Sequence, residues 1–451
     1  MLYFDSPNTN EVKSLIKARE IWDQFIEGNY KTAEPGIIFW STMSDYSPSN
    51  YVGRPIICTN PCAEVPLEDG GACNLGSINL SRFVKDGFTP EASIDWDQLA
   101  ESSETLVRFL DNVVTWNEDL NALPKQRQAA SETRRLGLGV MGIADMLNQL
   151  GVAYDSEQGT MMIEKVMEYI TNASYQASSF IAKEKGASSI FDEEAYMECP
   201  FVKEALSEQT HNMIRKNGLR NIAIMSIAPT GSISNIVLGY KSEEKNYIGV
   251  SGGVEPIFST FYTRRSESFG NKMFKVFHST IQAYIDKMGI QEDIDKAEDV
   301  DEVLPEFLTR TAHKIDSVKR VGVQGVIQRY IDHSISSTIN LPEDVEPETI
   351  SDIYIKAWKN KLKGVTIYRD GSRFPILSVE NKMTEFQEMK NKSFSIMQEN
   401  GETIDMAGDD IFKRPDGKLT TMYHHLKKMK TESEDESKTT ETVATTEEVK
   451  V

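Results

Sequence analysis

Hydrophobic residues recur along the chain in two kinds of pattern. Helical spacing with one buried stripe predicts amphipathic helices over residues 11–29, 96–117, 130–150 and 154–185. Short apolar runs predict buried strands over residues 37–40, 221–227 and 365–368. Helices that alternate with short apolar runs indicate an α/β fold, and no internal repeat of fixed period is visible.

The pattern weakens toward the C-terminus. Beyond about residue 376 the hydrophobic periodicity fades, and the last 21 residues hold seven acidic residues and two lysines, a net charge of 2 − 7 = −5. Such a segment buries too little apolar surface to fold. We expect a main domain over 1–375, a small extension over 376–430 and a disordered acidic tail over 431–451.

Composition narrows the classes of function. The chain has 451 residues, of which 39% are hydrophobic, and 49 basic against 69 acidic side chains give a net charge of −20. This charge disfavours binding to nucleic acid or to an anionic membrane surface. No apolar stretch reaches the length of a membrane span, and the first residues lack the pattern of a signal peptide. We therefore expect a cytoplasmic protein.

Three of the four cysteines lie within sixteen residues, which directs attention to this region. Asn60, Cys62 and Glu64 stand at alternate positions, so an extended strand would place an amide, a thiol and a carboxylate on one face. A thiol can act as a nucleophile or a sulfur radical, and a carboxylate can accept a proton. The alternative is a strand end with one buried cysteine and two solvated polar groups.

Cys73 follows Cys62 by eleven residues, across a turn that contains Gly70 and Gly71. The two cysteines could lie on adjacent strands and face one pocket, where a thiol pair would be redox active. The alternative for Cys73 is a small buried hydrophobic residue.

A third candidate site follows the apolar run 221–227. Its loop offers a glycine for close backbone approach and several hydroxyls, and a helix after the loop would present free N–H groups to an anion. The alternative is an ordinary N-capped helix. The candidate residues are Pro229, Thr230, Gly231, Ser232 and Ile233, with Ser234 after them.

Together these segments closely resemble the catalytic (large, or alpha) subunits of ribonucleotide reductases. The resemblance rests on six motifs that stand in the family's order: NPCAE at 60–64, ACNLGSINL at 72–80, RRLGLGVMG at 134–142, IAPTGSIS at 227–234, GGVEPIF at 252–258 and TIYRDGSR at 366–373. It implies that the chain forms the C-terminal part of a ten-stranded α/β barrel around a central finger loop.

The resemblance also implies a reaction and its residues. Members of the family reduce ribonucleotides to 2′-deoxyribonucleotides for DNA synthesis. By analogy, a thiyl radical on Cys62 takes the 3′ hydrogen of the ribose, Glu64 takes the 3′ hydroxyl proton and Asn60 holds that hydroxyl. Cys73 matches one member of the cysteine pair that gives the reducing equivalents. Pro229–Ile233 match the site for the substrate's diphosphate or triphosphate.

The radical source distinguishes the classes of this family. The candidate position for a tyrosine pair reads Ile367-Tyr368-Arg369 and holds one tyrosine. This favours similarity to the adenosylcobalamin-dependent class, class II. The alternative is a class I large subunit, with no bound cofactor and a radical from a dimetal small subunit.

Two parts of the family pattern are missing from the sequence. The motifs of the first half of the barrel are absent, so the resemblance implies a partner chain that carries this N-terminal half. No cysteine follows Cys199, so we expect thioredoxin, glutaredoxin or a further chain to reduce the active-site disulfide. A non-catalytic regulatory or decoy fragment is the rival interpretation, although a decoy has no need for the thiols.

Overall fold

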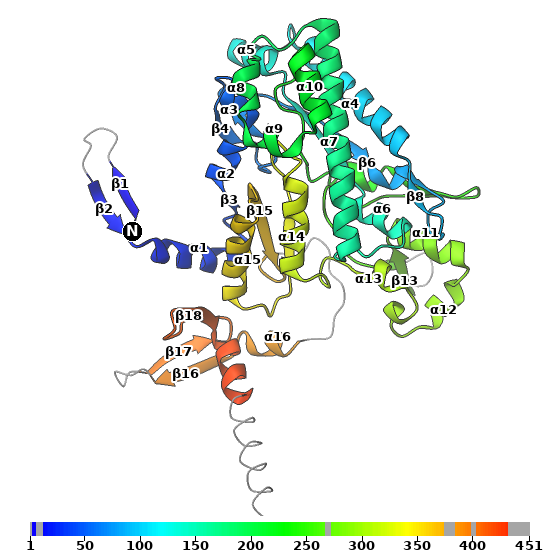
Figure 1. Ribbon diagram of the computed structural model, residues 1–451. Helices are drawn as coiled ribbons and strands as arrows, with labels where there is room; N and C mark the ends of the chain where they lie inside the picture. The colour runs from blue at the N-terminus through cyan, green and yellow to red at the C-terminus, as the bar shows by residue number, and fades with distance from the viewer. Residues whose placement is uncertain (1, 6–11, 267–271, 374–383, 398–402, 432–451) are drawn as a thin grey trace, which may run out of the picture. The chain divides into compact units, whose positions relative to one another are not determined.

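The computed structural model describes residues 2–5, 12–266, 272–373, 384–397 and 403–431 (Figure 1). The chain divides into two compact units. The first comprises Met1–Pro35, Leu341–Ile353 and Ile367–Val451, and the second comprises Gly36–Asn340 and Tyr354–Thr366. All candidate site residues lie in the second unit.

The second unit is mainly helical around short strands. Its helices are α2 (Trp40–Asp45), α3 (Pro48–Tyr51), α4 (Trp96–Asn117), α5 (Pro124–Thr133), α6 (Ile143–Gln149), α7 (Glu157–Lys185), α8 (Glu193–Met197), α9 (Pro200–Ala205), α10 (Glu208–Asn217), α11 (Ser279–Met288), α12 (Gln291–Lys296), α13 (Glu306–Thr309) and α14 (Ser317–Gln328), with 3₁₀ turns η1 (Leu80–Phe83), η2 (Ile233–Asn235) and η4 (Val300–Glu302). Its strands are β3 (Ile37–Ile38), β4 (Ile56–Thr59), β5 (Pro66–Glu68), β6 (Asn74–Asn79), β7 (Val84–Lys85), β8 (Ser93–Ile94), β9 (Leu136–Met141), β10 (Leu238–Lys241), β11 (Asn246–Ile248), β12 (Phe261–Ser266) and β13 (Lys272–Phe277). The elements β14 (Thr338–Leu341), α15 (Pro347–Lys359) and β15 (Gly364–Arg369) contribute residues to both units.

A row of mostly parallel segments forms the centre of the second unit. Strand β6 pairs in parallel with β9, and Leu138 of β9 makes a parallel bridge to Met225. Ile227 then bridges Ile335, and Ser337 accepts a backbone hydrogen bond from Thr366 of β15, which pairs with β3 at the far side. The predicted α/β class is therefore confirmed, with segment 221–227 as an extended central member of the row.

The predicted helix over 130–150 is wrong, because this segment holds a helix end, strand β9 and helix α6. All six residues of β9 are buried, so the strand has no polar face to reveal its period. Gly139 is required here, because a Cβ atom would lie 2.4 Å from the carbonyl oxygen of Ser226. The glycines thus serve the close approach of two strands, not the packing of a helix.

The other predicted elements agree with the structure to different extents. Helix α4 has the predicted bounds, and α7 covers most of the predicted helix over 154–185. The helix predicted over 11–29 is partly wrong, since Val12–Ile16 form β2 and the helix α1 begins at Ala18. The strand predicted over 37–40 is β3, which is shorter because α2 begins at Trp40.

The first unit combines the two chain ends. Its elements are β1 (Leu2–Asp5), β2 (Val12–Ile16), α1 (Ala18–Thr32), α16 (Glu385–Met389), β16 (Ser393–Met397), β17 (Thr403–Ala407), β18 (Ile411–Lys413), β19 (Leu419–Thr421) and a final helical stretch, 422–431. The boundaries predicted at residues 375 and 430 stay predictions, and the predicted acidic tail lies outside the described residues except for Thr431.

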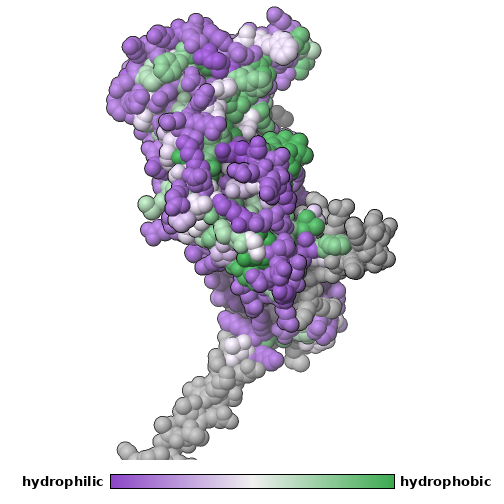
Figure 2. All heavy atoms as spheres, turned by 90° about the vertical axis from the view of Figure 1, so that its right-hand side faces the viewer, coloured by the Kyte–Doolittle hydropathy of each residue, from purple (hydrophilic) through white to green (hydrophobic). Residues whose placement is uncertain are grey.

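The face shown in Figure 2 is mostly hydrophilic, and hydrophobic residues gather on it in separate patches. Within the described part of the chain, no helix has both the length and the apolar character that crossing a membrane requires.

Candidate active site

A short hairpin carries the first candidate residues. Strands β4 and β5 pair in an antiparallel manner, and residues 60–65 connect them as a tight tip. The prediction of an extended strand at this place is wrong, because Ala63 has a left-handed backbone with φ of 63°. Asn60 braces the tip: its side-chain Oδ1 accepts from Val65 N at 3.0 Å, and its carbonyl oxygen accepts from Ala63 N at 3.0 Å.

Cys62 and Glu64 differ sharply in exposure. Cys62 is exposed at the tip, whereas the Glu64 side chain is buried, with 2% of its surface accessible. Partial burial, and after it the Glu64 carboxylate, raises the pKa of the Cys62 thiol, so the sulfur carries its hydrogen at neutral pH. The Glu64 Oε2 atom is buried and has no hydrogen-bond partner among the described residues. The site thus pairs an accessible S–H group with a free carboxylate oxygen.

The tip is held against the central row of strands. The carbonyl oxygen of Glu64 accepts hydrogen bonds from Ser334 N and from Ser226 Oγ, both at 2.9 Å. Ser226 and Ser334 belong to neighbouring segments of the row. The β4–β5 hairpin, called the finger hairpin below, is therefore attached to this row of segments at Glu64.

Cys73 lies immediately before β6 and is half-buried. The prediction that Cys62 and Cys73 stand on adjacent strands is wrong, because neither residue lies in a strand. Burial raises the pKa of the Cys73 thiol to about 12, and Arg135 opposes this rise. Of the remaining cysteines, Cys58 is exposed on β4 and Cys199 is buried, and all four are free thiols.

A cluster of buried charges beside Cys73 was not predicted as functional. Arg135 has only 1% of its surface accessible, and its guanidinium donates to Glu68, to Ser49 and to the ring of His333. Arg135 stood within a recognised motif, but sequence alone does not separate buried charges from solvated ones.

Hydrogen bonds hold the loop that follows segment 221–227. Thr230 adopts a left-handed backbone with φ of 53°, and its Oγ1 accepts from Gly253 N at 2.8 Å. The predicted helix after the loop is only the 3₁₀ turn η2. Among the described residues, the backbone N–H groups of 230–233 donate to no partner, so the loop offers consecutive donors without a helix.

Comparison with known proteins agrees with this architecture. The family described as "Ribonucleotide reductase, barrel domain" matches residues 2–368. The chain therefore belongs to the ribonucleotide reductase family. This confirms the predicted family, and the row of parallel strands fits the barrel that the family description names.

The most similar relatives include two vitamin B12-dependent ribonucleoside-diphosphate reductases. The protein of Thermoplasma acidophilum is 35% identical over 383 residues, which cover 82% of this chain and 44% of that protein. The protein of Mycobacterium tuberculosis is 32% identical over 382 residues, covering 82% and 49%. The chain thus spans about half the length of the curated relatives it matches. The class Id ribonucleotide reductase alpha subunit of Actinobacillus ureae shares the fold, with a TM-score of 0.59 at 22% identity over 78% of this chain and 61% of that one.

Proposed function

We propose that this chain carries the reaction centre of a ribonucleotide reductase and converts ribonucleoside diphosphates to 2′-deoxyribonucleotides by thiyl-radical chemistry. One observation carries the proposal: the exposed Cys62 thiol stands two residues from the buried Glu64, whose Oε2 atom has no hydrogen-bond partner in the described part of the chain. A weak S–H bond can exchange hydrogen with a C–H bond, and a free carboxylate oxygen can accept a proton.

The roles proposed for the finger residues fit their contacts. Cys62, as a thiyl radical, takes the 3′ hydrogen of the ribose and returns it after the 2′ hydroxyl leaves as water. Glu64 accepts the proton of the 3′ hydroxyl. Asn60 uses Oδ1 to brace the tip, which leaves its amide N–H groups for the same hydroxyl. Cys73 gives one reducing equivalent, together with a second thiol that another chain supplies.

The substrate's phosphates are assigned to Pro229, Thr230, Gly231, Ser232 and Ile233. Consecutive N–H groups in a loop form a concave donor set that suits phosphate oxygens. The Thr230 contact to Gly253 N fixes the left-handed turn on which this donor set depends.

Adenosylcobalamin is the proposed cofactor, and when bound it supplies the radical. The exposed position of Cys62 fits a large cofactor that must approach the sulfur, and the names of the relatives from Thermoplasma and Mycobacterium include vitamin B12 dependence. We also propose two partners: a second chain that carries the other barrel strands, and a thioredoxin or glutaredoxin that acts as the reductant. The proposed location is the cytoplasm.

The test is formation of deoxynucleotide by the full chain, co-expressed with a chain that carries the other barrel half, with adenosylcobalamin, a ribonucleoside diphosphate and dithiothreitol. We expect product with the wild type and none with Cys62→Ser. Cys58→Ser is the matched control on the same hairpin and should retain activity, because Cys58 is exposed and its sulfur donates to the Leu67 carbonyl of β5.

Three results would contradict parts of the proposal. An equal loss of deoxynucleotide formation in the Cys58 and Cys62 variants would contradict the role of Cys62 as the radical residue. Product that forms only with an added metalloprotein would exclude the cobalamin assignment. Reduction by the purified chain alone would refute the need for a second chain.

A further inference from the structure

Charged side chains collect at one end of the central row of strands. Arg135 directly precedes β9, Lys363 directly precedes β15, and Asp332 and His333 precede the bridge residue Ile335. Cys73 directly precedes β6. Since the first residues of neighbouring parallel strands meet at the same edge, the Cys73 thiol and this charge cluster share one end of the half-barrel.

Arg135 connects the cluster to the finger hairpin. Its Nε and one terminal nitrogen donate to Glu68 Oε2 at 3.1 and 2.5 Å, and Glu68 is the last residue of β5. The same terminal nitrogen donates to Ser49 at 2.9 Å, and the other lies 2.7 Å from His333 Nε2. One buried guanidinium thus joins the hairpin to two further segments.

The contact with Arg135 determines the state of His333. An arginine can only donate, so His333 Nε2 must accept and the ring proton must be on Nδ1. Burial first, and then the charges of Arg135 and Lys363, hold the pKa of His333 well below its usual value. His333 is therefore a neutral acceptor for Arg135.

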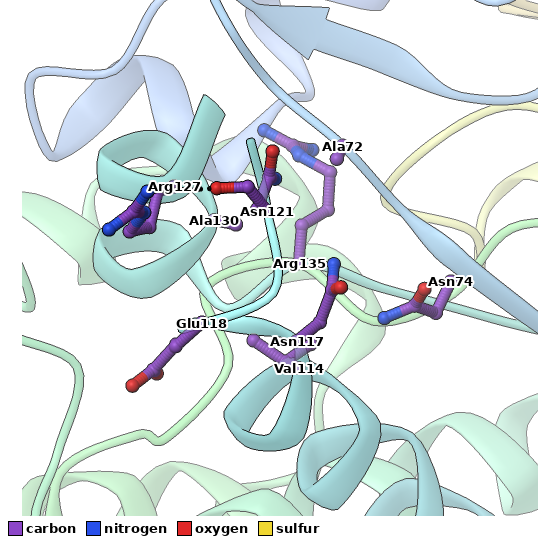
Figure 3. Close-up of a pocket in the computed structure, with 9 residues that line it drawn as sticks. All are labelled: Ala72, Asn74, Val114, Asn117, Glu118, Asn121, Arg127, Ala130 and Arg135. Carbon is purple, nitrogen blue, oxygen red and sulfur yellow. Dashed lines mark hydrogen bonds between the residues drawn. The ribbon is translucent and has the colours of Figure 1, made fainter. Parts of the chain in front are cut away.

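The chain from Glu68 to Cys73 folds directly over this cluster. Gly71 N donates to the Glu68 carbonyl, and a Cβ atom on Gly71 would lie 3.1 Å from the Glu68 carboxyl carbon. Ala72, Asn74 and Arg135 line one small pocket, and in Figure 3 the guanidinium end of Arg135 points toward Ala72. On the other side, a Cβ atom on Gly137 would lie 3.0 Å from Cys73 Sγ.

We propose that Arg135 is a positioning residue for Cys73: its contacts with Glu68 and His333 fix the segment that carries the thiol and place a buried positive charge beside the sulfur. The importance of Cys73 for turnover rests on the proposed function. The effect of Arg135 on the thiol does not, because it concerns the ionisation of one cysteine and is measurable without turnover.

The charged groups near Cys73 determine whether a substitution should increase or decrease the thiolate fraction of this residue. Arg135 favours the thiolate, whereas Asp332, Glu68 and Glu64 disfavour it and raise the pKa of Cys73 in addition to burial. Loss of the Arg135 charge should thus reduce the thiolate fraction, and loss of the Glu68 charge should increase it. A general loosening of the segment would instead make Cys73 more reactive in both variants.

The experiment measures alkylation of Cys73 by iodoacetamide in the full chain between pH 7 and 10, quantified by mass spectrometry of the Cys73 peptide. Cys58 is the internal reference for reagent and exposure. We expect Arg135→Met to slow the Cys73 reaction about tenfold at a given pH, the effect of a pKa rise of about one unit. Glu68→Gln should speed it, and Arg135→Lys, which keeps the charge, should remain near the wild type.

Arg134→Lys is the matched control, since Arg134 is also buried but pairs with Asp111 and Glu118. It should leave the Cys73 rate unchanged. If Arg135→Met does not fold, three other variants still decide the question. Glu68→Gln and the double variant Arg135→Lys plus Glu68→Gln keep a positive charge at position 135 and lose the negative charge at position 68, so both should react faster than the wild type. Arg135→Lys alone should not, and a faster reaction in this variant would indicate loosening of the segment. Equal rates in all variants, or a faster reaction in both Arg135→Met and Glu68→Gln, would overturn the proposal.

Discussion

The backbone N–H of Ser334 donates to the carbonyl oxygen of Glu64 at 2.9 Å, and the Ser226 hydroxyl donates to the same oxygen. Two segments of the barrel wall therefore hold one atom of the finger. Because the Glu64 side chain begins at the next carbon, the position of its carboxylate depends directly on this junction.

Ser226→Ala should lower the free energy of unfolding by about 1 kcal/mol, since it removes one buried hydrogen bond and leaves the Glu64 carbonyl with Ser334 alone. Urea denaturation of the full chain measures the change. Ser334→Ala is the matched control: its Oγ is buried and has no hydrogen-bond partner among the residues that the structure describes, and its backbone contact survives, so the stability of this variant should remain near that of the wild type. A larger loss for Ser334→Ala than for Ser226→Ala would contradict this account.

Glu64→Gln should abolish most of the proposed turnover while the protein remains folded. The amide keeps the size of the side chain but cannot accept a proton, and removal of a general base costs about 10²- to 10⁴-fold in rate. The measurement is the rate of deoxynucleotide formation, with circular dichroism as the check on folding. Asp69→Asn is the control, because Asp69 is an exposed carboxylate just after the hairpin, paired with Lys125. Full activity of Glu64→Gln would exclude Glu64 as the base.

Gly139→Ala should destabilise the barrel by about 1–3 kcal/mol, the usual cost of overpacking. The added methyl group would meet the backbone of Ser226 at 2.4 Å, and a backbone atom cannot turn away as a side chain can. Gly322→Ala on α14 is the control, since its methyl group would meet no atom within 4 Å. The latter change should stabilise the helix by about 0.5–1 kcal/mol. Thermal unfolding of both variants tests the contrast, and equal melting temperatures would contradict it.

The sequence was most informative where a pattern is local. Helix α4 shows one buried face to the core and one to solvent, so its period predicts its bounds. Strand β9 has no such contrast, because all six residues are buried and its partners come from β6 and from Met225. A segment of this kind is ambiguous until its remote neighbours are known.

The sequence also predicted only part of the candidate site. Motifs located Cys62, Glu64 and Thr230, but not the turn that exposes the first and buries the second. The contact between Arg135 and Glu68 joins residues 67 positions apart. No local pattern in the sequence indicates that two such charges share a buried cluster.

The buried imidazole of His333 should make stability fall in mild acid. Burial and the charges of Arg135 and Lys363 hold its pKa well below the ordinary value of 6.5 in the folded protein. Below about pH 6.5 the unfolded chain therefore binds a proton that the folded chain does not, and unfolding becomes more favourable as the pH decreases. Uptake of one proton on unfolding lowers the free energy of unfolding by at most about 1.4 kcal/mol for each pH unit of acidification. His333→Gln keeps an acceptor for Arg135 without this ionisation, so urea denaturation between pH 7 and 5 should show a shallower loss of stability than in the wild type. The same slope in both proteins would show that His333 does not remain neutral in the fold.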